Sequence, residues 1–241
     1  MNLWGITHRG VVREENQDAF SIRTLSEQQL LAVVCDGMGG ARAGNVASTM
    51  AVETFLELFD QLWSRGDLPV EQVLESAAAY ANESVYRRST KDDACFGMGT
   101  TMVAVLLDQG RATILNEGDS RAYHITPQSI TRVTRDHSLV EDLVLRGDLT
   151  PDQARSHPHK NLITRALGAE SELHADLFVQ DVKQGEFLLL CSDGLSNVVS
   201  DQEILYEVLH GGAVEDCCQR LLDITLKRGA PDNVTVALIQ C

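Results

Sequence analysis

The sequence predicts an α+β fold built on antiparallel strands. Three short apolar runs, at 101–107, 112–116 and 121–125, follow one another with only turn residues between them, and strands joined in this way pair antiparallel. Two long amphipathic stretches precede these runs, at 46–63 and after Pro69. Because such a meander does not suit a simple doubly wound parallel sheet, we expect helices packed against mainly antiparallel strands.

Composition indicates a single domain over residues 1–241. A chain of this length buries about 70% of its unfolded surface in one core. The 35 acidic and 20 basic residues give a net charge of −15, which argues against nucleic acid or an anionic membrane as a partner. No run approaches the ~18 apolar residues of a membrane span, so we expect a cytoplasmic protein. We also expect a monomer.

The helices of the first half are predicted by apolar spacing. Apolar residues recur three and four positions apart over 46–63, after the glycine-rich stretch 37–44. A second helix follows Pro69 and carries one apolar stripe as far as Val85. We expect these two helices to pack together against a sheet.

The segment between Asp136 and Gly168 has a different pattern, with short helical pieces rich in charge. Thr150 is a cap residue, Pro151 suits the first helical position and Gln153 lies three residues after the cap, which together predict a helix start. The apolar stripe of this segment is thin. We therefore expect residues 136–168 to form a mobile surface subdomain, the flap.

Two helices are predicted for the rest of the chain, and free thiols for all six cysteines of the whole chain. Ser200 and Glu203 form a capping box that opens one helix, and Gly211-Gly212 closes it. The last helix runs from Val214 and stops near Gly229. The cysteines show no C-x-x-C spacing, so neither structural zinc nor a disulfide framework is expected.

Four aspartates lie where apolar runs meet glycine or another turn residue. Asp36 follows the run 30–35, Asp119 comes shortly after 112–115, Asp193 follows 187–191, and Asp232 precedes 234–239. Carboxylates gathered at strand ends repel one another unless a cation lies between them. Oxygen-rich clusters are the ligands that hard divalent ions prefer. The sequence therefore predicts a site for divalent metal ions.

Six motifs occur in a fixed order along the whole chain. They are Thr7-x-x-Gly10-x-x-Arg13-x-x-Asn16-Gln17-Asp18, Asp36-Gly37-Met38-Gly39-Gly40, Gly99-Thr100-Thr101, Gly118-Asp119-Ser120-Arg121, Ser192-Asp193-Gly194 and Asp232-Asn233-Val234-Thr235. One Asp-Gly pair carries no information, but six ordered motifs are specific. With them the chain resembles the bacterial metal-dependent serine/threonine protein phosphatases of type 2C, and Asp136-His137-Ser138 and 161–168 resemble that family's flap.

The resemblance implies a sandwich of two antiparallel β-sheets flanked by helices (αββα), with two to three Mn²⁺ or Mg²⁺ ions at one end. Asp36 would bridge two ions beside the carbonyl of Gly37, and Asp193 and Asp232 would complete the first ion's protein ligands. Asp119 would join Asp193 in a weaker third site.

Two further roles are implied by the same motifs. Asp18 would hold metal-bound water, and Arg13 would bind the substrate phosphate. The catalytic set is then Asp18 with the three aspartates 36, 193 and 232. The implied reaction is attack of a metal-bridging hydroxide on phosphoserine or phosphothreonine in a protein, with no protein nucleophile. The resemblance also makes an opposing serine/threonine kinase a plausible partner.

The chain departs from the family pattern in the loop after Asp36. Ala41 stands where bacterial members commonly have histidine, Asn45 where they have glutamate, and Met38 where animal members have histidine. A histidine acid for the leaving oxygen is thus missing at both places, and a metal-bound water or a flap residue would have to donate that proton. The seven histidines are interpreted as surface or structural residues.

Several alternatives remain open at the level of sequence. Arg13 pairing with Glu14, Glu15 or another acid is the alternative to phosphate binding, and Asn233 either orients a metal ligand or only satisfies a turn. A phosphoprotein-binding pseudophosphatase or signalling module would normally lose metal-ligand aspartates, and none is lost here. A haloacid-dehalogenase type of enzyme needs Asp-x-Asp, which Asp36-Gly37-Met38 lacks.

Overall fold

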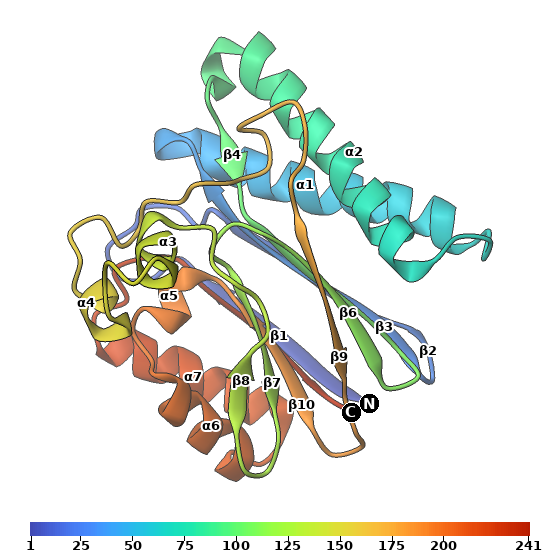
Figure 1. Ribbon diagram of the computed structural model, residues 1–241, viewed down its shortest axis with the longest axis vertical. Helices are drawn as coiled ribbons and strands as arrows, with labels where there is room; N and C mark the ends of the chain where they lie inside the picture. Colours follow the sequence, from blue (N-terminus) through green and yellow to red (C-terminus); the bar gives the residue numbers. More distant parts are fainter.

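Two antiparallel β-sheets face each other, and helices cover both outer faces (Figure 1). The computed structural model describes the backbone of residues 1–241 and the side chains of all of them except residues 40–42. Every strand pair in the two sheets is antiparallel. The expected αββα sandwich is confirmed.

The first sheet has the strand order β1-β11-β10-β7-β8. Its strands are β1 (Asn2–His8), β11 (Val234–Gln240), β10 (Phe187–Cys191), β7 (Arg121–Ile125) and β8 (Ile130–Arg132). Helices α6 (Asp201–His210) and α7 (Val214–Lys227) pack on its outer face. The capping box of Ser200 and Glu203 is formed as predicted.

The second sheet has the order β2-β3-β5-β6-β9, and a short strand β4 pairs with β3. Its strands are β2 (Asp18–Ser26), β3 (Gln29–Met38), β4 (Gly99–Thr100), β5 (Met102–Asp108), β6 (Arg111–Glu117) and β9 (Asp176–Asp181). Helices α1 (Gly40–Trp63) and α2 (Val70–Lys91) lie together on its outer face, as expected (Figure 1). Helix α1 begins six residues before the predicted start at 46. A 3₁₀ turn, η1 (Asp93–Cys95), follows α2.

Strand β3 is buried on both faces, and this explains its unbroken apolar sequence. Leu30, Ala32 and Val34 pack between the two sheets. The alternate residues, Leu31, Val33 and Cys35, pack beneath α1 and α2. Since successive strand residues point to opposite faces, a strand in the middle of such a sandwich has no position left for a polar residue until it reaches its end.

The predicted meander of three strands is wrong in one respect. β5 and β6 pair as expected, but β7 pairs with β10 and β8 in the other sheet. The chain crosses between the sheets at residues 118–120. Gly118 has φ +109° there, and a Cβ at that position would lie 2.6 Å from the Thr101 side chain, so the crossing requires glycine. This crossing places Asp119 at one end of the sandwich.

The flap contains two short helices, α3 (Leu139–Leu145) and α4 (Pro151–Arg155). The predicted capping box of Thr150 and Gln153 opens α4. Val140 is the one fully buried side chain of α3, and every side chain of α4 is at least partly exposed. Figure 1 shows α3, α4 and the short helix α5 (Asp193–Ser196) gathered at one end of the sandwich, and the two termini together toward the other.

Two properties of the described residues bear on the environment of the protein. All six cysteines are free, and five of them are buried. Within the part of the chain that was searched, every helix is too short or too polar to cross a membrane.

Candidate active site

The sandwich brings the predicted metal-ligand and phosphate-binding residues to one hollow of about 560 Å³, here called the catalytic hollow. Asp36 and Gly37 come from the end of β3, Asp119 from the crossing after β6, and Asp193 from the start of α5. Asp232 precedes β11. The residues of the predicted set that line this hollow are Arg13, Asp36, Gly37, Asp119, Asp193 and Asp232.

Asp18 lies behind this lining. It is the first residue of β2 and sits opposite Asp36 in the register of β2 with β3. The Ser192 hydroxyl donates to its Oδ2 at 2.7 Å and the Thr235 hydroxyl at 2.6 Å. The other oxygen, Oδ1, is buried and has no hydrogen-bond partner among the described atoms. The arrangement leaves one oxygen of a fixed carboxylate free to accept a hydrogen bond at the site.

The backbone of Asp36 is fixed by the Gly-Thr-Thr motif. Its N–H donates to the Thr101 Oγ1 at 2.9 Å, and its carbonyl accepts from the Thr101 N–H and the Thr100 hydroxyl, each at 2.9 Å. The Thr101 and Ser120 hydroxyls are 2.7 Å apart, which ties β3 to the crossing that carries Asp119. These hydrogen bonds therefore fix the backbone near two predicted metal ligands, Asp36 and Asp119, and do not involve the carboxylates of those aspartates.

Gly37 occupies a position that excludes any side chain. Its N–H donates to the carbonyl of Gln17 at 3.0 Å. A Cβ on Gly37 would lie 2.0 Å from the carbonyl oxygen of Gly44, and a Cβ on Gly194 would lie 1.9 Å from that of Asn233. The glycines of the two Asp-Gly motifs are thus required by close backbone approach beside the aspartates.

Burial and mutual repulsion act together on the acids. Desolvation, reinforced by the neighbouring aspartates, raises the pKa of Asp18 to about 7, of Asp119 to about 8 and of Asp193 to about 6. The pKa of Asp36 is raised well above its ordinary value by burial and then by Asp18 and Asp193. Asp193 Oδ1 is also buried without a partner among the described atoms. A cluster of this kind is stabilised by a multivalent cation.

The donor set fits hard ions that retain water. Among the described residues, no three His, Cys, Asp or Glu side chains converge closely enough to chelate one ion by themselves. Mg²⁺ and Mn²⁺ prefer oxygen ligands, and Mg²⁺ keeps several waters and takes only one or two carboxylates from a protein. Aspartates spread around one hollow, with the Gly37 carbonyl among its walls, suit ions of this kind.

Arg13 contacts one of the predicted ligands. Its Nη2 lies 2.7 Å from Oδ2 of Asp232, and the arginine side chain is 52% exposed. The hydrogen bond to Asp232 is the main cause that raises the pKa of Arg13. The acidic partner left open by the sequence is therefore Asp232, rather than Glu14 or Glu15.

Asn233 anchors the loop that carries Arg13. Its Nδ2 donates to the carbonyls of Arg9 and Glu15, both at 2.9 Å, and its Oδ1 accepts from the Gln17 N–H at 2.8 Å. These three bonds join the start of β11 to both ends of the loop. Neither of the two sequence interpretations describes this role, since Asn233 positions the loop that carries Arg13, the predicted phosphate-binding residue.

His137 is a site residue whose role sequence reasoning missed. It is 4% exposed. Its Nδ1 accepts from the Gly118 N–H at 3.1 Å, and its backbone N–H donates to the Gly118 carbonyl at 2.9 Å. Its Nε2 lies 3.1 Å from Asp176, and its carbonyl accepts from the flap residue Thr164 at 2.8 Å. Burial lowers the pKa of His137, which favours the neutral ring. His137 therefore fixes the turn that carries Asp119 and connects this turn to the rest of the flap.

One of the departures from the family pattern, Met38, lines the catalytic hollow. The Oδ1 of Asn45 is buried without a partner among the described atoms. The side chain of Ala41 lies outside the described residues. Among the described residues that line the catalytic hollow, none is a histidine.

The fold and the acidic hollow together define a class of enzyme, the metal-dependent phosphatases. The model of the family described as protein phosphatase 2C matches residues 7–233, and the chain belongs to that family. The match covers every motif from Gly10 to Asn233.

Named relatives agree with this assignment. A serine/threonine phosphatase, stp, of Listeria monocytogenes is 34% identical over 237 residues, which cover 97% of this chain and 93% of the relative. The serine/threonine protein phosphatase PstP of Mycobacterium tuberculosis is 38% identical over 230 residues, which cover 95% of this chain and 43% of PstP.

Solved structures show the same fold. Stp1 of Staphylococcus aureus matches with a TM-score of 0.89 at 35% identity, covering 99% of this chain and 94% of Stp1. The catalytic domain of PstP in complex with two manganese ions matches with a TM-score of 0.84 at 33% identity, covering 98% of this chain and 96% of that domain. The chain is thus an enzyme of the serine/threonine phosphatase class.

Proposed function

We propose that the chain hydrolyses phosphoserine and phosphothreonine in proteins at a centre of two Mn²⁺ or Mg²⁺ ions, with a looser third. The observation that carries the proposal is the catalytic hollow itself, where Arg13 and four aspartates line one space and burial raises the pKa of Asp36 and of Asp193. The PstP domain that binds two manganese ions supports the count of two.

The residues of the catalytic hollow would have distinct roles around that centre. Asp36, Asp193 and Asp232 would hold the ions together with the Gly37 carbonyl, and Asp119 would share the looser site with Asp193. When bound, such ions supply an activated water and neutralise charge on the phosphate oxygens. The free oxygen of Asp18 is suited to orient a water, because its other oxygen is fixed by Ser192 and Thr235.

The pair of Arg13 with Asp232 suggests how phosphate binding follows metal binding. A cation on Asp232 would take over the charge that Arg13 now neutralises. The guanidinium, which lies on an anchored loop, would then be free to donate two parallel bonds to phosphate oxygens. We propose that a water, or a side chain of the flap, donates a proton to the leaving serine or threonine oxygen.

The wider setting follows from the same class of function. We propose phosphorylated proteins as substrates, a serine/threonine kinase as the opposing enzyme, and a monomer as the working form. Six free cysteines support a reducing compartment such as the cytoplasm, where disulfides are rare.

The direct test is release of phosphate from p-nitrophenyl phosphate and from a phosphothreonine peptide, with added Mn²⁺ and with EDTA. We expect turnover with Mn²⁺ only. Asp36→Asn should abolish it in folded protein, whereas Asp67→Asn, a change of the same type at an exposed residue after α1, should leave it intact. Folded native protein that binds phosphopeptide without metal-dependent turnover would instead indicate the pseudophosphatase.

A further inference from the structure

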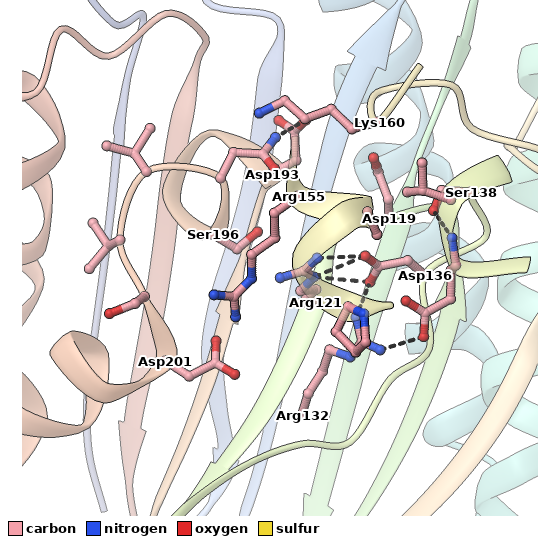
Figure 2. A pocket seen from close by; sticks show the side chains of 18 of the residues that line it. Asp119, Arg121, Arg132, Asp136, Ser138, Arg155, Lys160, Asp193, Ser196 and Asp201 are labelled. Carbon is pink, nitrogen blue, oxygen red and sulfur yellow. Dashed lines mark hydrogen bonds and ion pairs between the residues drawn. The ribbon is translucent and has the colours of Figure 1, made fainter. Parts of the chain in front are cut away.

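A second hollow, here called the flap hollow, opens beside the catalytic hollow. Its volume is about 500 Å³, and Asp119 and Asp193 line both spaces. Flap helices α3 and α4 form one side, and α5 with the first residues of α6 forms another (Figure 2). A group held in the flap hollow would therefore lie next to a phosphate bound at the metal centre.

Two of the four basic side chains that line the flap hollow are already neutralised. Arg121 makes a double hydrogen bond to Asp136, with Nη2 at 2.6 Å and Nε at 3.0 Å from its oxygens. Arg132 pairs with Glu141 and lies 3.4 Å from Asp136. These pairs build the wall between β7, β8 and α3 and leave no free charge for a ligand.

The other two cations are Arg155, at the end of α4, and Lys160, in the loop that follows. Within the described side chains, neither makes a hydrogen bond or an ion pair. Figure 2 shows Arg155 reaching into the flap hollow and Lys160 lying above Asp193. Lys160 is close enough to contribute to the electrostatics of the Asp193 carboxyl, which places its charge at the boundary of the two hollows.

The opposite wall adds a neutral donor. The hydroxyl of Ser196, on α5, is buried and has no hydrogen-bond partner among the described atoms. Figure 2 shows it on the side of the hollow that Arg155 approaches. A buried hydroxyl without a partner costs free energy unless a ligand or water satisfies it.

The acids of the lining do not cancel these cations once the metal centre is loaded. Asp119 and Asp193 are predicted metal ligands, and Glu203 pairs with Arg228. Asp201 remains, and it is the first residue of α6, where the positive end of the helix dipole offsets its charge. The flap hollow then offers two cations and a hydroxyl.

We propose that Arg155, Lys160 and Ser196 form an anionic subsite for a second acidic group of the phosphoprotein substrate, near in sequence to the phosphorylated residue being hydrolysed. The group is a phosphate or a carboxylate, since the guanidinium fork matches both and an ammonium adds a point charge. The subsite deepens the proposed phosphatase function and rests on it. It would make the enzyme prefer sites with clustered phosphates or acidic residues.

The test uses phosphothreonine peptides with otherwise neutral sequences. One arm places a glutamate one to four residues before or after the phosphothreonine, and the other arm places a second phosphothreonine there. With Mn²⁺, we expect the best-placed acidic group to raise kcat/KM of the native enzyme about tenfold over the neutral peptide. The two arms separate recognition of a carboxylate from recognition of a phosphate.

The variants Arg155→Ala and Lys160→Ala should each reduce this preference to about threefold or less. Arg146→Ala is the matched control, because Arg146 is an exposed flap arginine that does not line the flap hollow. Equal loss in the control would show a general effect of flap charge and overturn the subsite. A native enzyme without preference in either arm, or a preference kept in both subsite variants, would do the same.

The same measurements separate failure of the subsite from failure of the proposed function. If the native enzyme releases no phosphate from any peptide with Mn²⁺, the phosphatase function itself is wrong. If it hydrolyses the neutral peptide but treats acidic peptides alike, only the subsite is wrong.

Discussion

Replacing one proposed metal ligand, Asp193, should make the metal-free enzyme more stable. Asp193→Asn keeps the shape of the side chain, and its amide oxygen is able to accept the bond from Asn197, whose Nδ2 now donates to Oδ2 of Asp193 at 2.9 Å. The change removes a carboxylate whose charge is disfavoured by burial and then by Asp232. With no ion bound, the variant therefore loses a desolvation cost and a repulsion that together outweigh the attraction of Arg121, Arg13 and Lys160 for this carboxylate.

The size of the effect follows from the raised pKa. Burial and Asp232 raise the pKa of Asp193 from 3.8 to about 6. At about 1.4 kcal/mol per unit this corresponds to at most about 3 kcal/mol. The acids titrate together and the hollow is open to water, so we halve this to about 1–2 kcal/mol. In a chain of this length the melting temperature of the metal-free variant should rise by about 2–8 °C.

The pH dependence has a definite sign. Because the folded pKa of Asp193 lies above the unfolded value, the native protein keeps its stability below pH 3.8 and loses it as the pH rises through about 6. The advantage of the variant should thus be complete at pH 8, smaller at pH 5 and absent below the unfolded pKa. With Mn²⁺ the order should reverse, because ions that bind only the folded native protein stabilise it.

The assay is thermal unfolding in EDTA and in excess Mn²⁺, at pH 8 and pH 5, for native protein, Asp193→Asn and the control Asp67→Asn. A variant that melts at or below the native temperature in EDTA at pH 8 would refute the account of repelling acids. A variant that Mn²⁺ stabilises as much as it does native protein would refute Asp193 as a ligand.

Three further changes test the roles of other residues. Arg13→Ala should raise KM for phosphopeptides about tenfold with a smaller effect on kcat, and an unchanged KM would exclude phosphate binding by Arg13. His137→Ala should loosen the Gly118 turn and so raise the Mn²⁺ concentration needed for half-maximal activity. His137→Asn keeps an acceptor near the position of Nδ1 and should bring that concentration part of the way back to the native value. Equal Mn²⁺ concentrations for the native protein and both variants would leave His137 a purely structural residue. Hydrogen bonds from Arg228 and then from Ser200 lower the pKa of Glu203 to about 2, so these contacts contribute stability above the ordinary value of 4.5 that is lost as the pH falls through about 2. Arg228→Ala should therefore move acid unfolding to higher pH, and an unchanged midpoint would contradict this.

Most of the strands that the sequence predicts are buried on both faces, although β7, which is also predicted, has two half-buried positions. β3, β5, β10 and β11 have nearly unbroken apolar runs because helices cover one face and the other sheet covers the second. β1, β2 and β9 were missed, since their residues are mostly half-buried or exposed and polar side chains interrupt the pattern. Burial on one face leaves a weak signal in strands at a sheet edge.

Periodicity predicts a strand but not its neighbour. The run 121–125 forms β7 as expected, yet its partners β10 and β8 lie in the other sheet. The change of sheet depends on the tight turn at Gly118, which a sequence shows only as a glycine among many. The order of strands along the chain is therefore a poor guide to which strands pair at the point where the chain crosses between the two sheets.

The residues that hold the site in place were harder to predict than those that line it. Asp36, Asp119, Asp193 and Asp232 have a local signal, an acid directly beside an apolar run. His137 has none, because Gly118 and Asp176 are 19 and 39 residues away and only the fold brings them together.

The same distinction applies to Arg13, the proposed phosphate-binding residue, and to the residue that supports its loop. The motif spacing around Arg13 predicts a functional residue, but its dependence on Asn233 spans more than 200 residues. Since Asn233 follows Asp232 directly, one short segment before β11 supplies a predicted metal ligand, the present partner of Arg13 and the anchor of its loop. The proposed metal binding at Asp232 and the proposed phosphate binding at Arg13 therefore depend on the same segment, and a change at Asn233 should weaken both.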